Sequence, residues 1–242
     1  MDTISNNLAN VNTNGHKASR INFQDMLYSV LRTPGATSGD TQIPNGIQIG
    51  HGTRVSEISK VFEQGAMKET GRDLDLAIEG DGFFEVTLPD GTLAYTRDGS
   101  FRRTAAGQVV TSDGYSVSGI DTIDDGTTDI TISGDGSFTT VVNGVSVQKG
   151  RLTLTRFSNP EGLRSIGRNL FTPTDASGSA QSGLNPGESG MGTLAQRYSE
   201  ASSVSVAEEL VSMIRAQRAY EANSKAIKAS DEMMGEANTL RR

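Results

Sequence analysis

The C-terminal end of this chain carries one continuous heptad pattern, which begins near Val204. Its apolar seam positions follow one another at spacings built from four and three residues: Val206, Leu210, Met213, Tyr220, Ile227 and Met234. Gln217, Ser224 and Asp231 are polar members of the same seam, and polar seam residues set register against specific partners. The pattern predicts a helix of about 35 residues, which would span about 50 Å. That length exceeds the width of a small β domain, so we expect a helical partner, the alternative being an amphipathic helix packed on its own domain.

The N-terminal segment, residues 1–33, supplies a partner within the chain. Two groups of its apolar residues fall at helical spacing: Ile4, Leu8 and Val11, followed by Phe23, Leu27, Val30 and Leu31. We expect Gly15 to stop the first helix, and Thr33-Pro34-Gly35 to end the second. The segment therefore predicts helices that pair with the C-terminal helix as a coiled coil.

Between the two ends, the apolar period changes from helical to alternating. Phe84, Val86 and Leu88 alternate before a Pro-Asp-Gly turn, and Asn143-Gly144 is the strongest two-residue hairpin signal in the chain. Asp-Gly pairs recur at Asp81, Asp90, Asp98, Asp113, Asp125 and Asp135. The stretch from Thr174 to Gly192 is rich in Gly, Ser and Asn and predicts an exposed loop. This middle region is typical of an antiparallel β domain.

These patterns predict an elongated α+β fold with a mainly antiparallel β domain in the centre and paired helices at its ends. The expected divisions are a helical segment at 1–33, an extended linker at 34–70, the β domain at 71–196 and the long helix at 197–242. We expect the helical packing residues to be Leu8, Val11, Leu27, Val206, Leu210, Met213, Ile214, Tyr220, Ile227 and Met234.

Composition excludes several classes of function. A formal charge of −7 and a pI near 4.9 disfavour nucleic-acid binding, which needs a basic face. The chain has no cysteine and no apolar run of the length that spans a membrane, so we expect neither thiolate metal sites nor membrane insertion. The first residues lack the basic and apolar regions of a cleavable signal peptide.

Catalytic chemistry is also not indicated. The only two histidines, His16 and His51, lie far apart in the sequence beside glycines, and the Asp-Gly pairs do not match an EF-hand loop. Asp-Gly at the end of a strand is ordinary turn chemistry. We therefore expect no enzyme, no cofactor and no metal site.

Four stretches of the sequence resemble one known family. Residues 5–15 (SNNLANVNTNG) and 206–225 (VAEELVSMIRAQRAYEANSK) resemble the terminal signatures of the flagellar basal-body rod and hook axial proteins. Residues 76–84 (LAIEGDGFF) and 95–101 (YTRDGSF) look like the central β domain of that family. The family motif positions are Asn6, Asn7, Leu8, Ala9, Asn10, Thr13, Gly15, Glu208, Glu209, Gln217 and Arg218. The likeness covers nearly the whole chain.

Within this family, the likeness is greatest to the distal-rod type. The segment from Leu31 to Gly50 is similar to an insertion of distal-rod members, and Arg218-Ala219-Tyr220-Glu221 is similar to their C-terminal helix. Family members usually carry a further apolar helical stretch before the Asn-rich motif, so we expect either a start upstream of Met1 or a truncated product.

The resemblance implies a structural subunit that polymerises through its terminal helices into a hollow shaft carrying torque from the motor to the hook. It also implies several partners: further copies of the chain, proximal-rod and hook-side axial proteins, periplasmic and outer-membrane ring proteins, and the flagellar type III export apparatus. The expected location is the periplasm-spanning rod of the basal body. The alternatives are a proximal-rod or hook subunit and, from another class, a secreted β-rich adhesin on a coiled-coil stalk.

Overall fold

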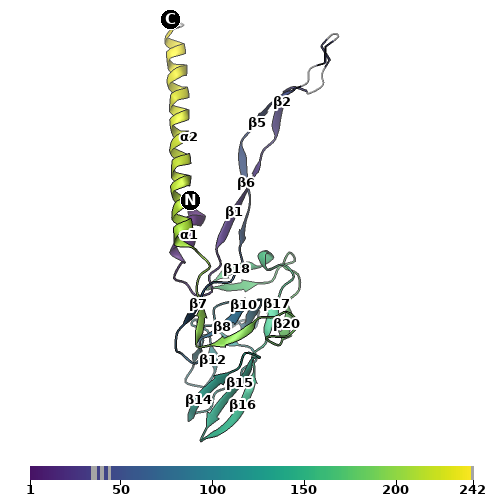
Figure 1. Ribbon diagram of the computed structural model, residues 1–242, viewed down its shortest axis with the longest axis vertical. Coiled ribbons are helices and arrows are strands. Elements are labelled where there is room, and N and C mark those ends of the chain that lie inside the picture. The colour runs from purple at the N-terminus through teal and green to yellow at the C-terminus, as the bar shows by residue number, and fades with distance from the viewer. Residues whose placement is uncertain (34–36, 39–40, 43–44, 241–242) are drawn as a thin grey trace. The chain divides into compact units, whose positions relative to one another are not determined.

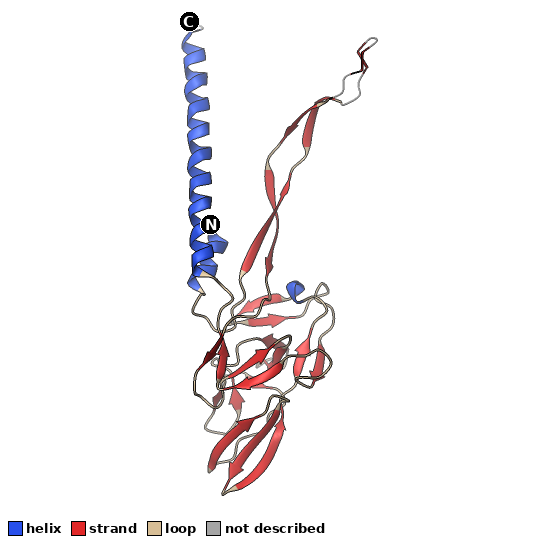
Figure 2. Ribbon diagram, in the orientation of Figure 1, coloured by secondary structure: helices blue, strands red, loops and turns tan. Residues whose placement is uncertain are grey.

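The computed structural model describes residues 1–33, 37–38, 41–42 and 45–240. The chain divides into two compact units: unit 1 is formed by Met1–Ala18 with Phe62–Arg242, and unit 2 by Ser19–Val61. Strands predominate, and the helices lie near the two ends of the chain (Figures 1 and 2). The fold class is therefore α+β, as the sequence predicts.

The strands of unit 1 are short, and their pairings in the sheets described here are antiparallel. In chain order they are β7 (Met67–Glu69), β8 (Leu76–Glu79), β9 (Phe83–Thr87), β10 (Leu93–Thr96), β11 (Arg102–Arg103), β12 (Val109–Val110), β13 (Ser116–Val117), β14 (Thr127–Ile132), β15 (Ser137–Val142), β16 (Val145–Arg151), β17 (Leu154–Arg156), β18 (Arg164–Gly167), β19 (Leu170–Thr172), β20 (Gln181–Leu184), β21 (Thr193–Gln196) and β22 (Tyr198–Glu200). The largest sheet has the order β11-β12-β13-β9-β10-β19-β18, and β17 joins β9 to β20. A meander β14-β15-β16 and the pairs β8–β21 and β7–β22 complete the unit.

The strand β9 lies between two apolar clusters. Phe84 and Val86, which the alternation places on one face, are fully buried in the larger cluster with Leu76 and Ile78. Phe83 points to the other cluster, where its ring centroid lies 5.6 Å from that of Phe157 in an edge-to-face contact. Burying an aromatic side chain of this size contributes about 1.5–3 kcal/mol relative to leaving it exposed. The core of unit 1 is therefore centred on β9, with a 3-10 turn, η1 (Pro160–Gly162), near the aromatic cluster.

The predicted hairpin at Asn143-Gly144 is confirmed. Both residues have positive φ, 52° and 78°, as a two-residue turn of the primed type requires, and they connect β15 to β16. The loop expected from Thr174 to Gly192 is partly wrong, because it contains β20, and Ser177 within it is fully buried. Pairing with β17 orders that stretch despite its turn-rich composition.

Unit 2 is built from strands, and here the sequence prediction is wrong. The helix expected from Phe23 to Leu31 is replaced by β1 (Ser19–Asp25) and β2 (Tyr28–Arg32). They pair with β6 (Thr53–Lys60) and β5 (Ile47–Gly50), and β3 (Thr37–Ser38) pairs with β4 (Thr41–Gln42). The expected helix stop at Pro34-Gly35 lies outside the described residues.

Cross-strand pairs explain why these residues form strands. In the register of β1 with β6, Ile21 lies opposite Ile58 and Phe23 lies opposite Val55, so apolar residues gather on one face. The opposite face is polar, and Asn22 Nδ2 donates to Glu57 Oε1 at 2.7 Å. The side chains of a strand alternate with a period of two, and β1 is stabilised by β6, which lies about 30 residues later in the chain. Helical spacing within one short segment gives no sign of that distant partner.

The two α-helices belong to unit 1. The long C-terminal helix is confirmed as α2 (Val206–Leu240), and Glu208 and Glu209 in its first turn complement the helix dipole. The N-terminal helix α1 (Asp2–Ala9) is shorter than expected, since Asn10 caps its C-terminus. Gly15 is therefore not the helix stop; it lies beyond a series of turns and has a φ of 66°.

Candidate assembly site

The two helices contact each other near the start of α2. Asn7, only 2% exposed, donates from Nδ2 to Glu209 Oε1 at 2.8 Å. Met1, at the other end of α1, lines a surface cavity together with Ala216 and Tyr220. The helix α1 therefore runs antiparallel to α2 along its first turns, as the ribbon also shows (Figure 1).

This contact covers only a small part of α2. The expected packing residues Leu8, Val11 and Met213 are half-buried. Large apolar residues of α2 are exposed, and we call the six that the sequence predicts to pack the apolar stripe: Val206 (41%), Leu210 (44%), Ile214 (50%), Tyr220 (76%), Ile227 (63%) and Met234 (62%). Extended apolar surface of this kind marks an interaction site in a soluble protein. Among the described residues, the apolar stripe continues along α2 well beyond Met1, which lies at the N-terminal end of α1.

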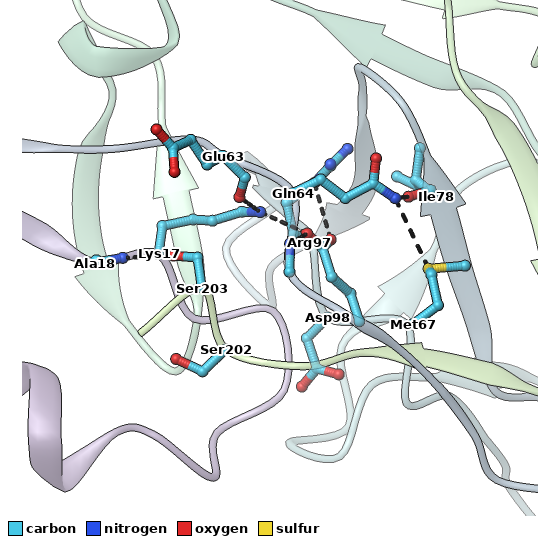
Figure 3. A network of polar contacts seen from close by, with 12 residues as sticks. Lys17, Ala18, Glu63, Gln64, Met67, Ile78, Arg97, Asp98, Ser202 and Ser203 are labelled. Atoms are coloured by element: carbon cyan, nitrogen blue, oxygen red, sulfur yellow. Dashed lines mark hydrogen bonds and ion pairs between the residues drawn. The ribbon is translucent and has the colours of Figure 1, made fainter. Parts of the chain in front are cut away.

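Below the helices, a carboxylate is fully buried between two cations. Glu200, at the end of β22, has Oε1 at 2.5 Å from Lys17 Nζ, and both side chains are 0% exposed. Its Oε2 lies 3.2 Å from Nε of Arg97, whose side chain is 5% exposed. The amide of Gly65 also donates to Glu200 Oε1 at 2.9 Å. We call the side chains of Lys17, Arg97 and Glu200 the buried junction; Lys17 and Arg97 are labelled in Figure 3.

Backbone carbonyls take the other donors of the two cations. Lys17 Nζ donates to Glu63 O at 2.6 Å, a bond drawn in Figure 3. Arg97 Nη1 donates to Gly80 O at 2.9 Å and to Gly82 O at 2.6 Å. Buried charges are tolerated when they are paired and hydrogen-bonded in this way.

The electrostatics of the buried junction balance desolvation against attraction. Burial lowers the pKa of Lys17 from its ordinary value, and the neighbouring Glu200 carboxylate opposes that shift. Burial likewise lowers the pKa of Arg97, again against the attraction of Glu200. Replacing a well-formed buried ion pair by apolar residues is often neutral or stabilising, whereas removing one partner is costly. Loss of one partner of the buried junction should therefore cost more than the intact junction contributes to stability.

Residues of the N-terminal motif also bind the backbone next to the buried junction. Gly15 N donates to Glu200 O at 2.8 Å. A Cβ at Gly15 would lie 2.8 Å from Asp98 N, so this position and its positive φ both require glycine. Asn14 Nδ2 donates to Ser100 Oγ at 3.1 Å, and Asn14 O accepts from Asn169 Nδ2 at 3.0 Å.

The remaining predicted residues lie in different surroundings. Asn10 Nδ2 donates to Asn6 O at 2.8 Å and Thr13 Oγ1 donates to Asn10 Oδ1 at 3.2 Å, so these motif residues order the turn after α1. The exposed motif residues are Asn6, Ala9, Glu208, Gln217 and Arg218. Leu27 lies between β1 and β2 and is 85% exposed, so its assignment to a helical seam is corrected: it is in no helix.

Sequence reasoning missed the buried junction. Arg97 falls within a stretch that resembles the family, and Lys17 follows the N-terminal motif closely, but neither was singled out. Glu200 lies 183 positions from Lys17, and lysine, arginine and glutamate are rarely buried, so no local pattern indicates the cluster. The one sequence signal is position: Arg97 lies within a family-like stretch, and Lys17 and Glu200 lie close to the two terminal motifs.

In the described parts of the chain, neither a cluster of three His, Asp or Glu side chains that could hold a metal ion nor a helix long and apolar enough to cross a membrane is present. His16 is buried and His51 is exposed, and they lie in different units.

Three family models match the chain. They are the flagellar hook protein FlgE/F/G D1 domain at residues 77–140, the flagellar basal body rod FlgEFG protein C-terminal region at 195–240, and the flagella basal body rod protein at 1–17. The flagellar basal-body rod protein FlgG of Borreliella burgdorferi is 46% identical over 247 residues, which span 100% of this chain and 93% of that protein. The chain belongs to the flagellar basal-body rod protein family.

The type within the family follows from a second comparison in one organism. FlgG of Bacillus subtilis is 40% identical over 250 residues, covering 100% of this chain and 93% of the relative. The flagellar hook-basal body complex protein FlhP of the same organism is 32% identical over 256 residues, with the same coverage. The chain is thus a FlgG-type structural subunit of the distal rod, in the flagellar basal body, and not an enzyme. The adhesin alternative does not fit this membership.

Proposed function

We propose that this FlgG-type subunit polymerises through its terminal helices into a hollow shaft that transmits motor torque to the hook. The observation that carries the proposal is the apolar stripe of α2, which α1 leaves exposed. A large apolar side chain gains about 1.5–3 kcal/mol when it moves from water into a packed interface. Six such residues on one helix favour helix-on-helix association over a free, solvated helix.

The heptad spacing supports a coiled coil as the form of that association. Leu210 and Met213 sit four and three residues from their seam neighbours, which is the spacing that keeps a seam facing a partner helix. The helix α1 has 8 residues and α2 has 35, so the described α1 covers only the first turns of α2 and leaves the rest of the seam open to a partner helix. Leu8 and Val11 on α1 would contribute to the same bundle.

The surroundings of the shaft follow from the family and are part of the proposal. The subunit would contact proximal-rod proteins at one end and hook-side axial proteins at the other. Periplasmic and outer-membrane ring proteins would surround it, and the flagellar type III apparatus would export it. An acidic chain without cysteine is compatible with this route, because no disulfide has to form before or after export.

The test is an aspartate placed in the apolar stripe. Leu210→Asp should abolish incorporation into rods, because a charge would be buried in the helix interface without a partner. Ala222→Asp is the matched control: it adds the same charge to an exposed position outside the seam, at a similar cost in helix propensity. Circular dichroism should show the β domain folded in both variants. Normal rod assembly by Leu210→Asp would overturn the proposal.

A further inference from the structure

The chain segments that flank unit 2 in the sequence are joined to each other at the buried junction. Lys17, next to the start of unit 2, donates to Glu63 O at 2.6 Å, just after its end. Gly65 N donates to the Glu200 carboxylate at 2.9 Å, and Ala201 N donates to Ala66 O at 2.9 Å. The Lys17 ammonium and the Glu200 carboxylate thus connect the two unit 1 segments that precede and follow unit 2, whose paired strands we call the unit 2 ribbon.

The same carboxylate lies just before α2. Glu200 is the last residue of β22, and α2 begins at Val206. In the short connection, Ser203 N donates to His16 O at 3.1 Å and Ser203 Oγ accepts from Ala18 N at 3.0 Å. The base of α2 is therefore hydrogen-bonded to the segment that carries Lys17.

A second set of bonds attaches this junction to the β domain. Arg97 reaches Glu200 from the end of β10 and is itself held by the carbonyls of Gly80 and Gly82. Gln64 adds a further link, since its Nε2 donates to Ile78 O at 3.2 Å and its Oε1 accepts from Gly80 N at 3.0 Å. Every link is short, and the ionic groups are removed from water, so rotation about this point would break charged hydrogen bonds.

We propose that Lys17 and Glu200 are positioning residues for rod assembly, which hold both attachments of the unit 2 ribbon and the base of α2 to the β domain before polymerisation and so stiffen the shaft. Only the stiffening of the shaft rests on the proposed function; the positioning within the free subunit does not. A buried ion pair is suited to the task because it fixes direction, whereas an apolar contact of equal size tolerates sliding. Within unit 1, force on α2 would reach the β domain through these side chains.

The first test uses the free subunit and does not depend on polymerisation. Lys17→Met removes the ammonium, keeps the stem and leaves Glu200 paired with Arg97. Hydrogen exchange at the amides of Gly65, Ala201 and Ser203 should then speed up on the order of 100-fold, the effect of removing one partner of a buried pair. Amides of β9 should be unchanged. Glu200→Gln, which is nearly isosteric, should act on the same amides and serves if Lys17→Met folds poorly.

Arg103→Met is the matched control. It removes a cation from an ion pair of unit 1 with Asp125, whose side chain is 97% exposed, so exchange at the junction should not move. Unchanged exchange at Gly65 and Ser203 in Lys17→Met would overturn the proposal. An equal rise across the whole β domain would also overturn it, because the role would then be general stability.

The second test measures the assembled shaft. Rods built from Lys17→Met should form, because the apolar stripe is intact, but electron microscopy should show greater bending than rods of the parent chain or of Arg103→Met. Rods of unchanged straightness would refute the stiffening role even if exchange in the free subunit rises. Failure of helix-driven assembly would appear instead in Leu210→Asp, so the two proposals fail separately.

Discussion

Asn7 Nδ2 lies 2.8 Å from Glu209 Oε1, and this hydrogen bond joins two ends of the chain that are 202 positions apart. Asn7 is almost fully buried although asparagine is a poor residue for a helix interior. The carboxylate that it meets belongs to the first turn of α2, where a negative charge already favours the helix dipole. The motif asparagine therefore has a physical role, which is to dock α1 against the start of α2.

Replacing Asn7 by alanine should release α1 from α2. The change removes a hydrogen bond to a charged group, which contributes about 1.5–3 kcal/mol. Hydrogen exchange in the free subunit should accelerate at the amides of α1 and of the first turns of α2. Asn6→Ala is the control, because the Asn6 side chain is exposed and only its backbone oxygen accepts a bond, from Asn10. Identical exchange in the two variants would remove the docking role from Asn7.

The long helix and the β-turns could be predicted because their signals are local. The seam of α2 repeats over successive heptads, and Asn143-Gly144 supplies the positive φ that its turn requires within two residues. Phe23, Leu27 and Leu31 misled the prediction because their helical spacing runs across two separate strands, β1 and β2, and the connection between them. The deciding evidence was the apolar pair Val55 and Ile58 on a partner strand distant in sequence.

The candidate site was predictable only in part, for a related reason. The spacing of apolar residues on α2 predicts an interface, and in the structure Leu210 and Tyr220 are exposed. Lys17, Arg97 and Glu200 meet only when three separate segments have folded together, and each is of a residue type that is usually found on the solvated surface. Sequence periodicity carries information about faces, not about which charges those faces enclose.

Asp135 should give the β14–β15 turn an acid-sensitive contribution to stability. It accepts hydrogen bonds from the side chain and amide of Ser137 and from Arg151 Nη2, which together lower its pKa from 3.8 to about 2. Because the folded-state pKa is the lower one, the contribution is present above pH 3.8 and is lost as pH falls from 3.8 to about 2. The difference in unfolding free energy between the parent chain and Asp135→Asn should shrink over that window.

Ser137→Ala tests whether the Ser137 hydroxyl causes the lowered pKa of Asp135. The Ser137 hydroxyl is the largest influence on Asp135, so its removal should raise the carboxyl pKa toward its ordinary value and narrow the acid window. Urea unfolding at several values of pH, followed by circular dichroism, measures all three chains. A gap between the parent chain and Asp135→Asn that stays constant down to pH 2 would contradict the assignment.

Gly15 and Gly114 allow backbone strain to be separated from close packing. Both have positive φ, 66° and 88°, but a Cβ at Gly114 would meet nothing within 4 Å. Gly114→Ala should therefore cost about 1–2 kcal/mol, the penalty for a left-handed conformation alone. At Gly15 the added Cβ would also lie 2.8 Å from Asp98 N and 2.9 Å from Arg97 C. The additional overlap should bring the cost of Gly15→Ala to about 2–5 kcal/mol.

The two alanine variants should differ in where hydrogen exchange speeds up as well as in how much unfolding free energy they lose. Displacing Gly15 moves the amide that donates to Glu200 O, so exchange should rise at Ala201 and Ser203 in Gly15→Ala and stay unchanged there in Gly114→Ala. Urea unfolding of both variants gives the free energies, and hydrogen exchange gives the location. Equal destabilisation by both changes would mean that the backbone conformation alone requires glycine at position 15. A larger loss of unfolding free energy for Gly15→Ala, with faster exchange beside the buried junction, would show that glycine is required at position 15 because the segments of Arg97 and Glu200 pack closely against it.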